Sequence, residues 1–374
     1  MTADKRTTPR PVVSALKPYA PTWSDFTPPE LCRLLERDSV AKLSFNESPY
    51  GPSPKAVAAM QGAACQVHQY YDMEAKELRR KIADYYRVSL DCVYLGSGGD
   101  EAIALLVNAF VSPGDEVVIP WPTFGQYANA TTIMDGVVVK VSVSPLNLKA
   151  DLEGMLAALT PRTKIIFLCN PNNPTGVAVN EEELRSFLSA VPTNVIVGLD
   201  EAYAEFVSDP DYASGVELLA EFPNVAVIRT FSKIYGLAGM RVGYGIAHPD
   251  IVNMVQRVRP LFNVNNLAQC GAMAALEDRE FVEMARTANS TERIWLSEQL
   301  AQLGWQVIPS QTNFLFVDTG IETTRLVEAA RAAGIIIRGG AGWGYPTFLR
   351  ISLGTREQLS ALLAVLTEAL GENA

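Results

Sequence analysis

The sequence predicts an α/β protein with a mostly parallel central sheet between helices, plus a smaller α+β domain. The middle of the 374-residue chain contains short runs of apolar, β-branched residues separated by stretches with helical spacing. These runs are apolar throughout rather than alternating, as in strands buried on both faces of a parallel sheet. The last third of the chain instead combines a long helical stretch with several strand-like runs.

The expected strands of the large sheet follow one another along the middle of the chain. They are placed at 92–95, 115–120, 136–143, 163–170, 194–200, 224–230 and 241–247. Helices between successive strands imply crossover connections and a doubly wound layer. Before them, the first ~20 residues are rich in Thr and Pro and show little periodicity, which predicts an extended arm.

The smaller domain is expected after "RPLFNVNNLAQ". A helix is predicted over 268–303, followed by strands in "WQVIPSQTNFLFVDT", "ARAAGIIIRGG" and "TFLRISLGT" with helices between them. We therefore divide the chain into an N-terminal arm with part of the small domain (1–48), a large domain (49–260) and a C-terminal small domain (261–374).

Composition and charge exclude several classes of protein. The chain is 48% hydrophobic and 19% charged, which is typical of a well-buried globule. It contains no run of ~18 apolar residues and no apolar core near its start, so we expect a cytoplasmic protein with no membrane partner. The net charge of -10 would repel nucleic acid, and no nucleic-acid partner is expected.

Cysteine and histidine usage argues against disulfides and metal sites. The five cysteines are odd in number, widely spread and form no CxxC pair, so buried free thiols are expected. Only two histidines are present, His68 and His248, and neither has the spacing of a metal ligand. The prediction is that no metal is bound and that no Ser-His-Asp triad is present.

A glycine-rich segment, "LGSGGDEAIALLVNAF", follows the strand at 92–95 and opens a helix at about Asp100. Glycines let backbone N–H groups approach a ligand closely, and a helix N-terminus favours an anion. Gly99 and Asp100 are therefore candidates for a phosphate cradle. A tight capping turn with Asp100 as the cap explains the same residues.

Two further strands end in polar residues. "CNPNNPTG" is rich in turn residues, yet a turn does not require Asn173, whose amide could donate to a ligand at the carboxyl edge of the sheet. "VGLDEAYAEF" places Asp200 at the end of an apolar strand. A buried carboxylate is costly unless paired, so Asp200 is either a cap or the partner of a buried cation.

The segment "RTFSKIYGLAGMRVGY" contains one lysine among small residues. In a partly desolvated pocket, Lys233 could lose its proton near neutral pH and form a Schiff base with a carbonyl. Thr230 and Ser232 supply hydroxyl donors, and the planar fork of Arg241 suits a phosphate. Read alone, a single lysine is usually a surface charge, and only the neighbouring motifs favour the chemical role.

Taken together, these segments describe one ligand, an aromatic aldehyde phosphate with a ring nitrogen and a phenolic oxygen. Asp200 would keep the ring nitrogen protonated, and Asn173 and Tyr203 would bond the phenolic oxygen. Lys233 would hold the aldehyde as an imine. The phosphate would lie against the backbone of Gly99 and Asp100 and the side chains of Thr230, Ser232 and Arg241. Pyridoxal 5'-phosphate meets this description.

With these residues in place, the sequence resembles the class I/II (fold-type I) pyridoxal-phosphate-dependent aminotransferases, and within them the histidinol-phosphate aminotransferases. The resemblance covers nearly the whole chain. It rests on "LKPYAP", "LSFNESPYGPSP", "GSGGDE", "PTFGQY", "NPNNPTG", "DEAY", "TFSKIYGLAGMRVGY", "FNVNNLAQ" and "LRISLGT", in the order of the family.

The resemblance implies roles around the cofactor. It makes Lys233 the Schiff-base lysine and proton shuttle, and Asp200 the partner of the pyridinium nitrogen. Phe124 takes the place of the aromatic side chain that stacks on the cofactor ring. Tyr70 matches the tyrosine that reaches the cofactor phosphate of the neighbouring subunit, which implies a homodimer.

Other residues match the family at the substrate end of the pocket. Arg350 corresponds to the arginine that receives the substrate α-carboxylate as a bidentate pair, with a surface salt bridge as its alternative. Tyr19 and Arg338 correspond to groups near the substrate phosphate; Tyr19 could instead anchor the arm, and Arg338 could pair with an acidic side chain. Asn46 and Glu47 are placed near the substrate, with loop capping as the alternative.

The implied activity is amino-group transfer in two half-reactions, with glutamate and 2-oxoglutarate as one pair and histidinol phosphate and imidazole-acetol phosphate as the other. "NESP" replaces the frequent "NENP", Phe124 stands where a tyrosine is frequent, and "GGAGWGYPTF" is unusually aromatic. An aromatic amino-acid or specialised-pathway transaminase is therefore an alternative. A threonine-phosphate decarboxylase is a second, and a cofactor-binding regulator a third.

Overall fold

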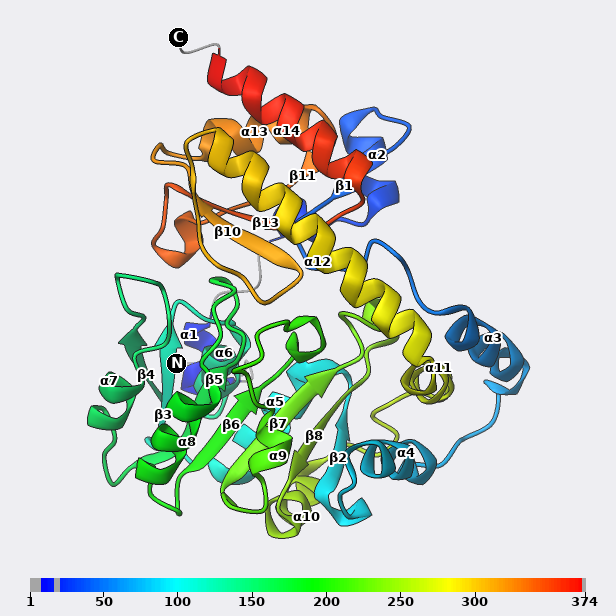
Figure 1. The fold of residues 1–374 in the computed structure, drawn as a ribbon. Helices are drawn as coiled ribbons and strands as arrows, with labels where there is room; N and C mark the ends of the chain where they lie inside the picture. The colour runs from blue at the N-terminus through cyan, green and yellow to red at the C-terminus, as the bar shows by residue number, and fades with distance from the viewer. Residues whose placement is uncertain (1–7, 17–20, 372–374) are drawn as a thin grey trace, which may run out of the picture.

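The computed structural model describes residues 8–16 and 21–371, and its largest element is a seven-stranded sheet (Figure 1). The strand order is β2-β8-β7-β6-β5-β3-β4. The strands are β2 (Val93–Gly96), β3 (Glu116–Trp121), β4 (Val137–Ser142), β5 (Thr163–Cys169), β6 (Ile196–Asp200), β7 (Val225–Thr230) and β8 (Gly243–Ala247). Strands β3 to β7 pair in parallel, and β8 is antiparallel to both of its neighbours. The predicted α/β class is thus confirmed.

Helices cover both faces of this sheet, which explains the continuous apolar runs. Val117 and Ile119 of β3 pack toward one face, whereas Val118 packs toward the other. The first face is covered by α5 (Gly98–Phe110), α6 (Gln126–Ile133) and α10 (Pro249–Val258), and the second by α7 (Leu152–Ala157), α8 (Glu181–Ala190) and α9 (Gly215–Leu218). Figure 1 shows α8 and α9 on one side of the sheet and α5 on the other.

A second, smaller sheet lies in the upper part of Figure 1. Its order is β12-β13-β10-β9, all antiparallel, and a separate parallel pair joins β1 to β11. These strands are β1 (Ala41–Lys42), β9 (Gln306–Val307), β10 (Phe314–Asp318), β11 (Ile335–Ile336), β12 (Arg338–Gly339) and β13 (Phe348–Ser352). The helices α12 (Arg279–Gln302), α13 (Thr324–Ala332) and α14 (Arg356–Gly371) pack on them. Leu43 joins the same core, so the N-terminal region packs with the C-terminal one.

The predicted long helix over 268–303 is two helices. The structure has α11 (Asn266–Glu277) and α12, with Asp278 between them in a non-helical conformation at φ -87 and ψ 65. Helical spacing alone could not reveal the break, because apolar residues recur on both sides of it. α11 packs against α3 (Pro54–Ala63), in a hydrophobic core that also contains residues of β2 and β8 of the large sheet. The domain boundary near residue 261 stays a prediction.

Two smaller predictions were wrong. The N-terminal arm contains a short helix, α1 (Pro11–Ala15), which starts with proline at its first position, where proline is well tolerated. β4 is not buried on both faces: it is the edge strand of the large sheet, and Val137 is 46% exposed. The remaining helices are α2 (Pro28–Leu35) and α4 (Lys76–Tyr86).

None of the helices within residues 8–16 and 21–371 combines the length and apolarity that crossing a bilayer requires.

Candidate active site

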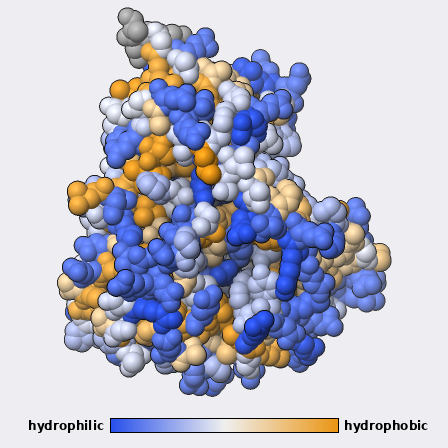
Figure 2. Space-filling model, in the orientation of Figure 1, coloured by the Kyte–Doolittle hydropathy of each residue, from blue (hydrophilic) through white to orange (hydrophobic). Residues whose placement is uncertain are grey.

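The candidate site lies at the carboxyl edge of the large sheet. Asp200 ends β6, Thr230 ends β7, and Asn173 lies in the loop that follows β5. Because these strands are parallel neighbours, their carboxyl ends meet at one edge, where open α/β sheets bind ligands. Figure 2 shows a hollow between the upper and lower parts of the molecule, bordered largely by hydrophilic residues.

Asp200 is a buried carboxylate with only neutral hydrogen-bond partners. The Tyr127 hydroxyl donates to its Oδ2 at 2.6 Å, and the backbone N–H of Ala202 donates to its Oδ1 at 3.0 Å. Burial raises the pKa of Asp200 to about 6, and the two hydrogen bonds oppose the rise. A cation that reached this carboxylate would therefore be bound strongly.

Tyr127 is a site residue that the sequence reasoning missed. It lies in α6, is fully buried and stacks on Phe167 of β5, with ring centroids 4.7 Å apart. The motif "PTFGQY" predicts Phe124 as a site residue and does not by itself single out Tyr127. The signal that could have found Tyr127 is its place in the same motif, three residues after Phe124, at the start of the helix α6 that follows the Phe124 loop. The two rings are 5.8 Å apart, edge to face.

Lys233 lies just after β7, in the loop that leads to the next strand. Its Nζ donates to the backbone carbonyl of Phe45 at 3.1 Å and lies 5.7 Å from the ring centroid of Tyr203. Burial, together with the nearby Arg350 guanidinium, lowers the pKa of Lys233 to about 8. A sizeable fraction of the amine is then neutral at physiological pH, as nucleophilic attack on a carbonyl requires.

The glycine-rich segment forms the start of α5. Gly98 has φ +79, and a Cβ there would collide with the guanidinium of Arg241. The helix begins at Gly98, two residues before the approximate start predicted at Asp100, and its N-cap position is Ser97, so the alternative interpretation of Asp100 as the cap was wrong. Asp100 lies in the first turn, and its Oδ2 accepts from Arg241 Nη2 at 3.1 Å. The positive φ is what requires glycine here, because side chains with a Cβ rarely adopt it.

Hydroxyl and guanidinium donors meet beside this helix start. The Thr230 hydroxyl donates to Ser232 Oγ at 2.9 Å, and Arg241 Nη1 donates to the same oxygen at 3.4 Å. Arg241 is held in the left-handed region, at φ 53, by the turn that precedes β8. Together with the free N–H groups of the first turn of α5, these donors form a cradle for an anion.

A chain of hydrogen bonds runs from Tyr203 to Arg350. The Tyr203 hydroxyl accepts from Asn46 Nδ2 at 3.0 Å and from Asn173 Nδ2 at 3.3 Å. On the other side of the same amide, Asn173 Oδ1 accepts from Arg350 Nη1 at 2.6 Å. These residues come from the start, middle and end of the chain, and the fold brings them together.

Arg350 is a buried cation with a donor to spare. It is 3% exposed, and its Nη2 donates to the backbone carbonyl of Ser44 at 2.5 Å. Its Nε has no hydrogen-bond partner, and burial lowers the pKa of the guanidinium to about 10. The predicted alternative, a surface salt bridge, does not apply, because Arg350 is buried. A buried N–H without a partner indicates a place for an acceptor from a ligand.

The other predicted residues lie around this centre. Arg338 is exposed and directly opposite Arg350 on the paired strands β12 and β13. Glu47 pairs with Lys42 at 3.6 Å, and Asn46 is buried at φ 57, where Ser352 Oγ donates to its Oδ1. Tyr70 is 87% exposed, and its ring contacts that of Phe262, with the centroids 4.9 Å apart. Tyr19 lies outside the described residues.

A buried ionic network fixes the loop that carries Asp200 and Tyr203, and sequence reasoning missed it. Arg229 donates to Glu201 at 2.5 Å and to Glu205 at 2.9 Å, and all three side chains are nearly inaccessible to solvent. Glu201 directly follows Asp200, and Arg229 directly precedes Thr230. The sequence signal for this network is Arg229, a charged residue inside the apolar strand at 224–230 and directly before the predicted site residue Thr230.

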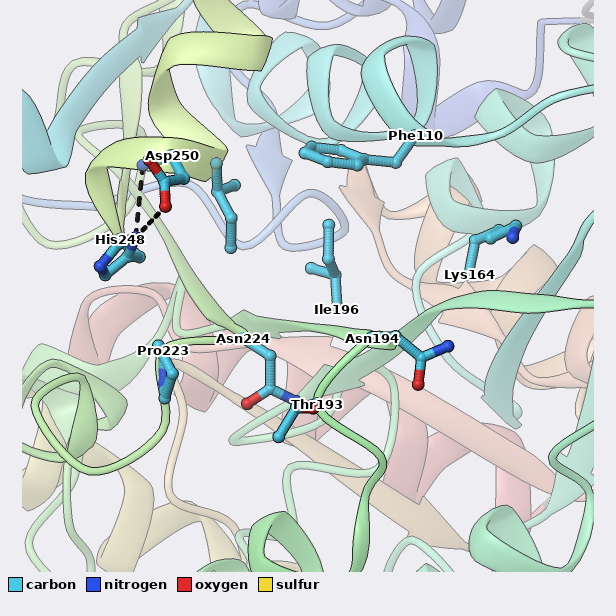
Figure 3. A pocket seen from close by; sticks show the side chains of 10 residues that line it. Phe110, Lys164, Thr193, Asn194, Ile196, Pro223, Asn224, His248 and Asp250 are labelled. Carbon is cyan, nitrogen blue, oxygen red and sulfur yellow. Dashed lines mark hydrogen bonds and ion pairs between the residues drawn. The ribbon is translucent and has the colours of Figure 1, made fainter. Parts of the chain in front are cut away.

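An open pocket of about 510 Å³ lies elsewhere in the structure (Figure 3). Its lining includes Lys164, Asn194, Asn224 and the His248–Asp250 pair, near the amino ends of the parallel strands. This is the edge opposite to Asp200 and Lys233. It shares no residue with the candidate site.

The arrangement fits the pyridoxal 5'-phosphate predicted from the sequence. The cradle at Gly98 would take the phosphate, and Asp200 would face a protonated ring nitrogen. Lys233 would reach the aldehyde, and Tyr203 with Asn173 would bond the phenolic oxygen. The partnerless Nε of Arg350 leaves an acceptor position beyond Asn173 for a second anionic group.

Comparison with known proteins agrees with this chemistry. A family model for the class I and II aminotransferases matches residues 38–366. The histidinol-phosphate aminotransferase of Moorella thermoacetica is 41% identical over 362 residues, which cover 96% of this chain and 92% of that protein. The enzyme of the same name from Anaeromyxobacter sp. is 43% identical over 362 residues, covering 96% and 98%.

Solved aminotransferase structures share the fold of this chain. Histidinol-phosphate aminotransferase from Sinorhizobium meliloti, in complex with pyridoxal-5'-phosphate, superposes with a TM-score of 0.90 at 29% identity over the whole of both chains. A double mutant of Thermus thermophilus aspartate aminotransferase gives a TM-score of 0.84 at 26% identity, covering 97% of this chain and 100% of that one. The chain belongs to the class I and II aminotransferases.

Proposed function

We propose that this aminotransferase uses pyridoxal 5'-phosphate to move the amino group of L-histidinol phosphate to 2-oxoglutarate, giving imidazole-acetol phosphate and L-glutamate. The observation that carries the proposal is the pair of arginines, Arg338 and Arg350, opposite each other at the substrate side of Lys233. Two guanidiniums suit a phosphate on one substrate and carboxylates on the other. The names of the relatives, at about 40% identity over most of the chain, support the same substrate.

The cofactor, when bound, supplies an electron-poor ring that delocalises the electron pair of a broken bond at the substrate α-carbon. The residues of the chain do the rest. Lys233 Nζ would take the proton from the substrate α-carbon and deliver it to the carbon that was the aldehyde carbon of the cofactor. Asp200 holds the proton on the ring nitrogen through its buried carboxylate. Arg350 binds the anionic group beside the α-carbon, and its contact to Asn173 fixes its direction.

The rate at which Lys233 captures pyridoxal phosphate should depend on pH. Only the neutral amine attacks an aldehyde, and burial lowers the pKa of Lys233 to about 8. We therefore expect the capture rate of the cofactor-free protein to rise about tenfold per pH unit below pH 8 and to level off above it. Stopped-flow absorbance measures this rate. A midpoint near the ordinary value of 10.5 would contradict the lowered pKa.

The proposed substrate is tested by a half-reaction screen. Purified enzyme with bound cofactor is mixed with histidinol phosphate, phenylalanine, tyrosine, tryptophan or threonine phosphate, and the cofactor spectrum is followed. We expect conversion to the amine form to be fastest with histidinol phosphate. Faster conversion with the aromatic amino acids would indicate an aromatic transaminase. Release of carbon dioxide from threonine phosphate would indicate a decarboxylase.

Replacing Arg338 by alanine should discriminate against the phosphorylated substrate. We expect kcat/KM to fall roughly 10-fold to 100-fold for histidinol phosphate, the size of one charge-assisted hydrogen bond, and less than about threefold for phenylalanine. Arg331→Ala is the matched control, because that guanidinium stacks on Trp23 away from the site, at 4.8 Å. An equal fall in kcat/KM for both substrates would show that Arg338 does not bind the substrate phosphate.

The homodimer and the cytoplasmic location also remain proposals. An apolar surface formed by Val67, Tyr70, Leu261 and neighbouring Phe262 supports the dimer, since three of its members are 62 to 87% exposed. Exposed apolar patches of this kind mark interfaces. In a dimer, Tyr70 would be free to reach the cofactor phosphate of the neighbouring subunit. Sedimentation of the wild type and of a Tyr70→Glu variant tests the interface.

A further inference from the structure

Trp343 lies between the two arginines of the substrate side. It ends a short 3₁₀ helix (Ala341–Trp343) that follows β12 directly. Its ring centroid is 4.6 Å from Cζ of Arg338 and 5.1 Å from Cζ of Arg350. Since Arg338 and Arg350 are opposite residues of an antiparallel pair, their side chains leave the same face of the sheet. The indole therefore contacts both guanidiniums at once.

The position of the indole is set from behind by the core and not by the arginines. Its edge meets the fully buried Phe316, at a centroid distance of 6.1 Å and an interplanar angle of 84°. Phe316 is packed in turn against Tyr345 and Phe348. Trp343 is thus supported by the core on one side and contacts the buried Arg350 and the exposed Arg338 on the other.

Two cations on opposite positions of a strand pair repel each other. Arg350 is buried, so water does not screen this repulsion well. Burial is the main cause that lowers the pKa of Arg350, and the charge of Arg338 lowers it by a smaller amount. An aromatic face attracts a guanidinium by an amount that corresponds to roughly 2-fold to 30-fold in an equilibrium constant. The Trp343 ring, in contact with both guanidiniums, offsets this repulsion and favours their staying side by side.

We propose that Trp343 is a positioning residue that presents Arg338 and Arg350 as one joint site for a phosphate group. This inference deepens the proposed function and rests on it. A phosphate monoester has three terminal oxygens around a tetrahedral phosphorus and can accept from both guanidiniums together. A single carboxylate has two oxygens in one plane and is satisfied by Arg350 alone. Trp343 thereby favours phosphorylated amines over plain amino acids.

The experiment uses the enzyme with its own cofactor bound, so that the cofactor phosphate site is filled. Isothermal titration calorimetry gives the Kd of inorganic phosphate and of acetate for the wild type and for Trp343→Phe, Trp343→Leu and Trp343→Met. Phenylalanine keeps an aromatic face, whereas leucine and methionine occupy the space without one. Two aliphatic variants are used so that one poorly folded protein does not decide the result.

We expect both aliphatic variants to bind inorganic phosphate about tenfold more weakly than the wild type and acetate less than threefold more weakly. Trp343→Phe should bind phosphate within threefold of the wild type. The kinetic counterpart is a raised KM for histidinol phosphate with kcat nearly unchanged. Trp295→Leu is the matched control: it removes a similar contact to Arg356, at 4.0 Å, away from the site, and should change neither Kd.

The proposal is overturned if the aliphatic variants bind phosphate as tightly as the wild type. It is equally overturned if they lose phosphate and acetate to the same extent, because Trp343 would then be a structural residue without a preference. A wild-type enzyme that does not convert histidinol phosphate would instead refute the proposed function. Phosphate binding by the same protein would still report on Trp343, so the two failures can be told apart.

Discussion

Lys233→Ala is expected to lose transamination almost completely, by at least roughly 10²-fold to 10⁴-fold in kcat, the range for removing a general base alone. The variant has no amine to hold the cofactor aldehyde and none to move the α-proton. The long-wavelength absorbance of the lysine-bound cofactor should disappear with it. Absorbance spectra and single-turnover rates measure both effects.

Lys164→Ala is the control for this prediction. Lys164 lines the pocket at the opposite edge of the sheet (Figure 3), so its loss should leave the spectrum and the rate unchanged. If Lys233→Ala kept the wild-type spectrum, another lysine would hold the cofactor. The assignment built on the geometry of Lys233 and Phe45 would then be wrong.

Asp200→Asn is expected to lower kcat on the order of 10²-fold to 10³-fold, the range for removing one preorganised electrostatic group. The amide has nearly the shape of the carboxylate but carries no charge. The site is buried, so water cannot replace the lost charge beside a protonated ring nitrogen. Steady-state kinetics and the dissociation constant of the cofactor check the result.

Asp250→Asn is the control, because that carboxylate is 93% exposed beside His248. Tyr127→Phe separates charge from hydrogen bonding, since it leaves the Asp200 carboxylate and removes only one donor to it. That hydrogen bond lowers the pKa of Asp200, so its loss should raise the pKa and move the acid limb of the pH profile upward. A kcat for Asp200→Asn within threefold of the wild type would argue against a role at the ring nitrogen.

The substrate side of the site shows where reasoning from sequence reached its limit. Arg338 and Arg350 are only 12 positions apart, and both were assigned from motifs. That they oppose each other on β12 and β13, with Trp343 between them, depends on the register of two short strands. A shift of one residue would send one of the arginines to the other face of the sheet. No local pattern specifies that register.

The sequence by itself determined the fold class and the chemical groups of the cofactor site. Apolar runs, glycines and strand-end polar residues are local signals, and each reports on its own segment. Only the tertiary structure decided which groups are partners: Tyr127 with Asp200, Asn46 with Tyr203, and Arg229 with Glu201 and Glu205. Hydrogen bonds and pKa values depend on burial and on distances between segments far apart in the chain, which folding alone sets.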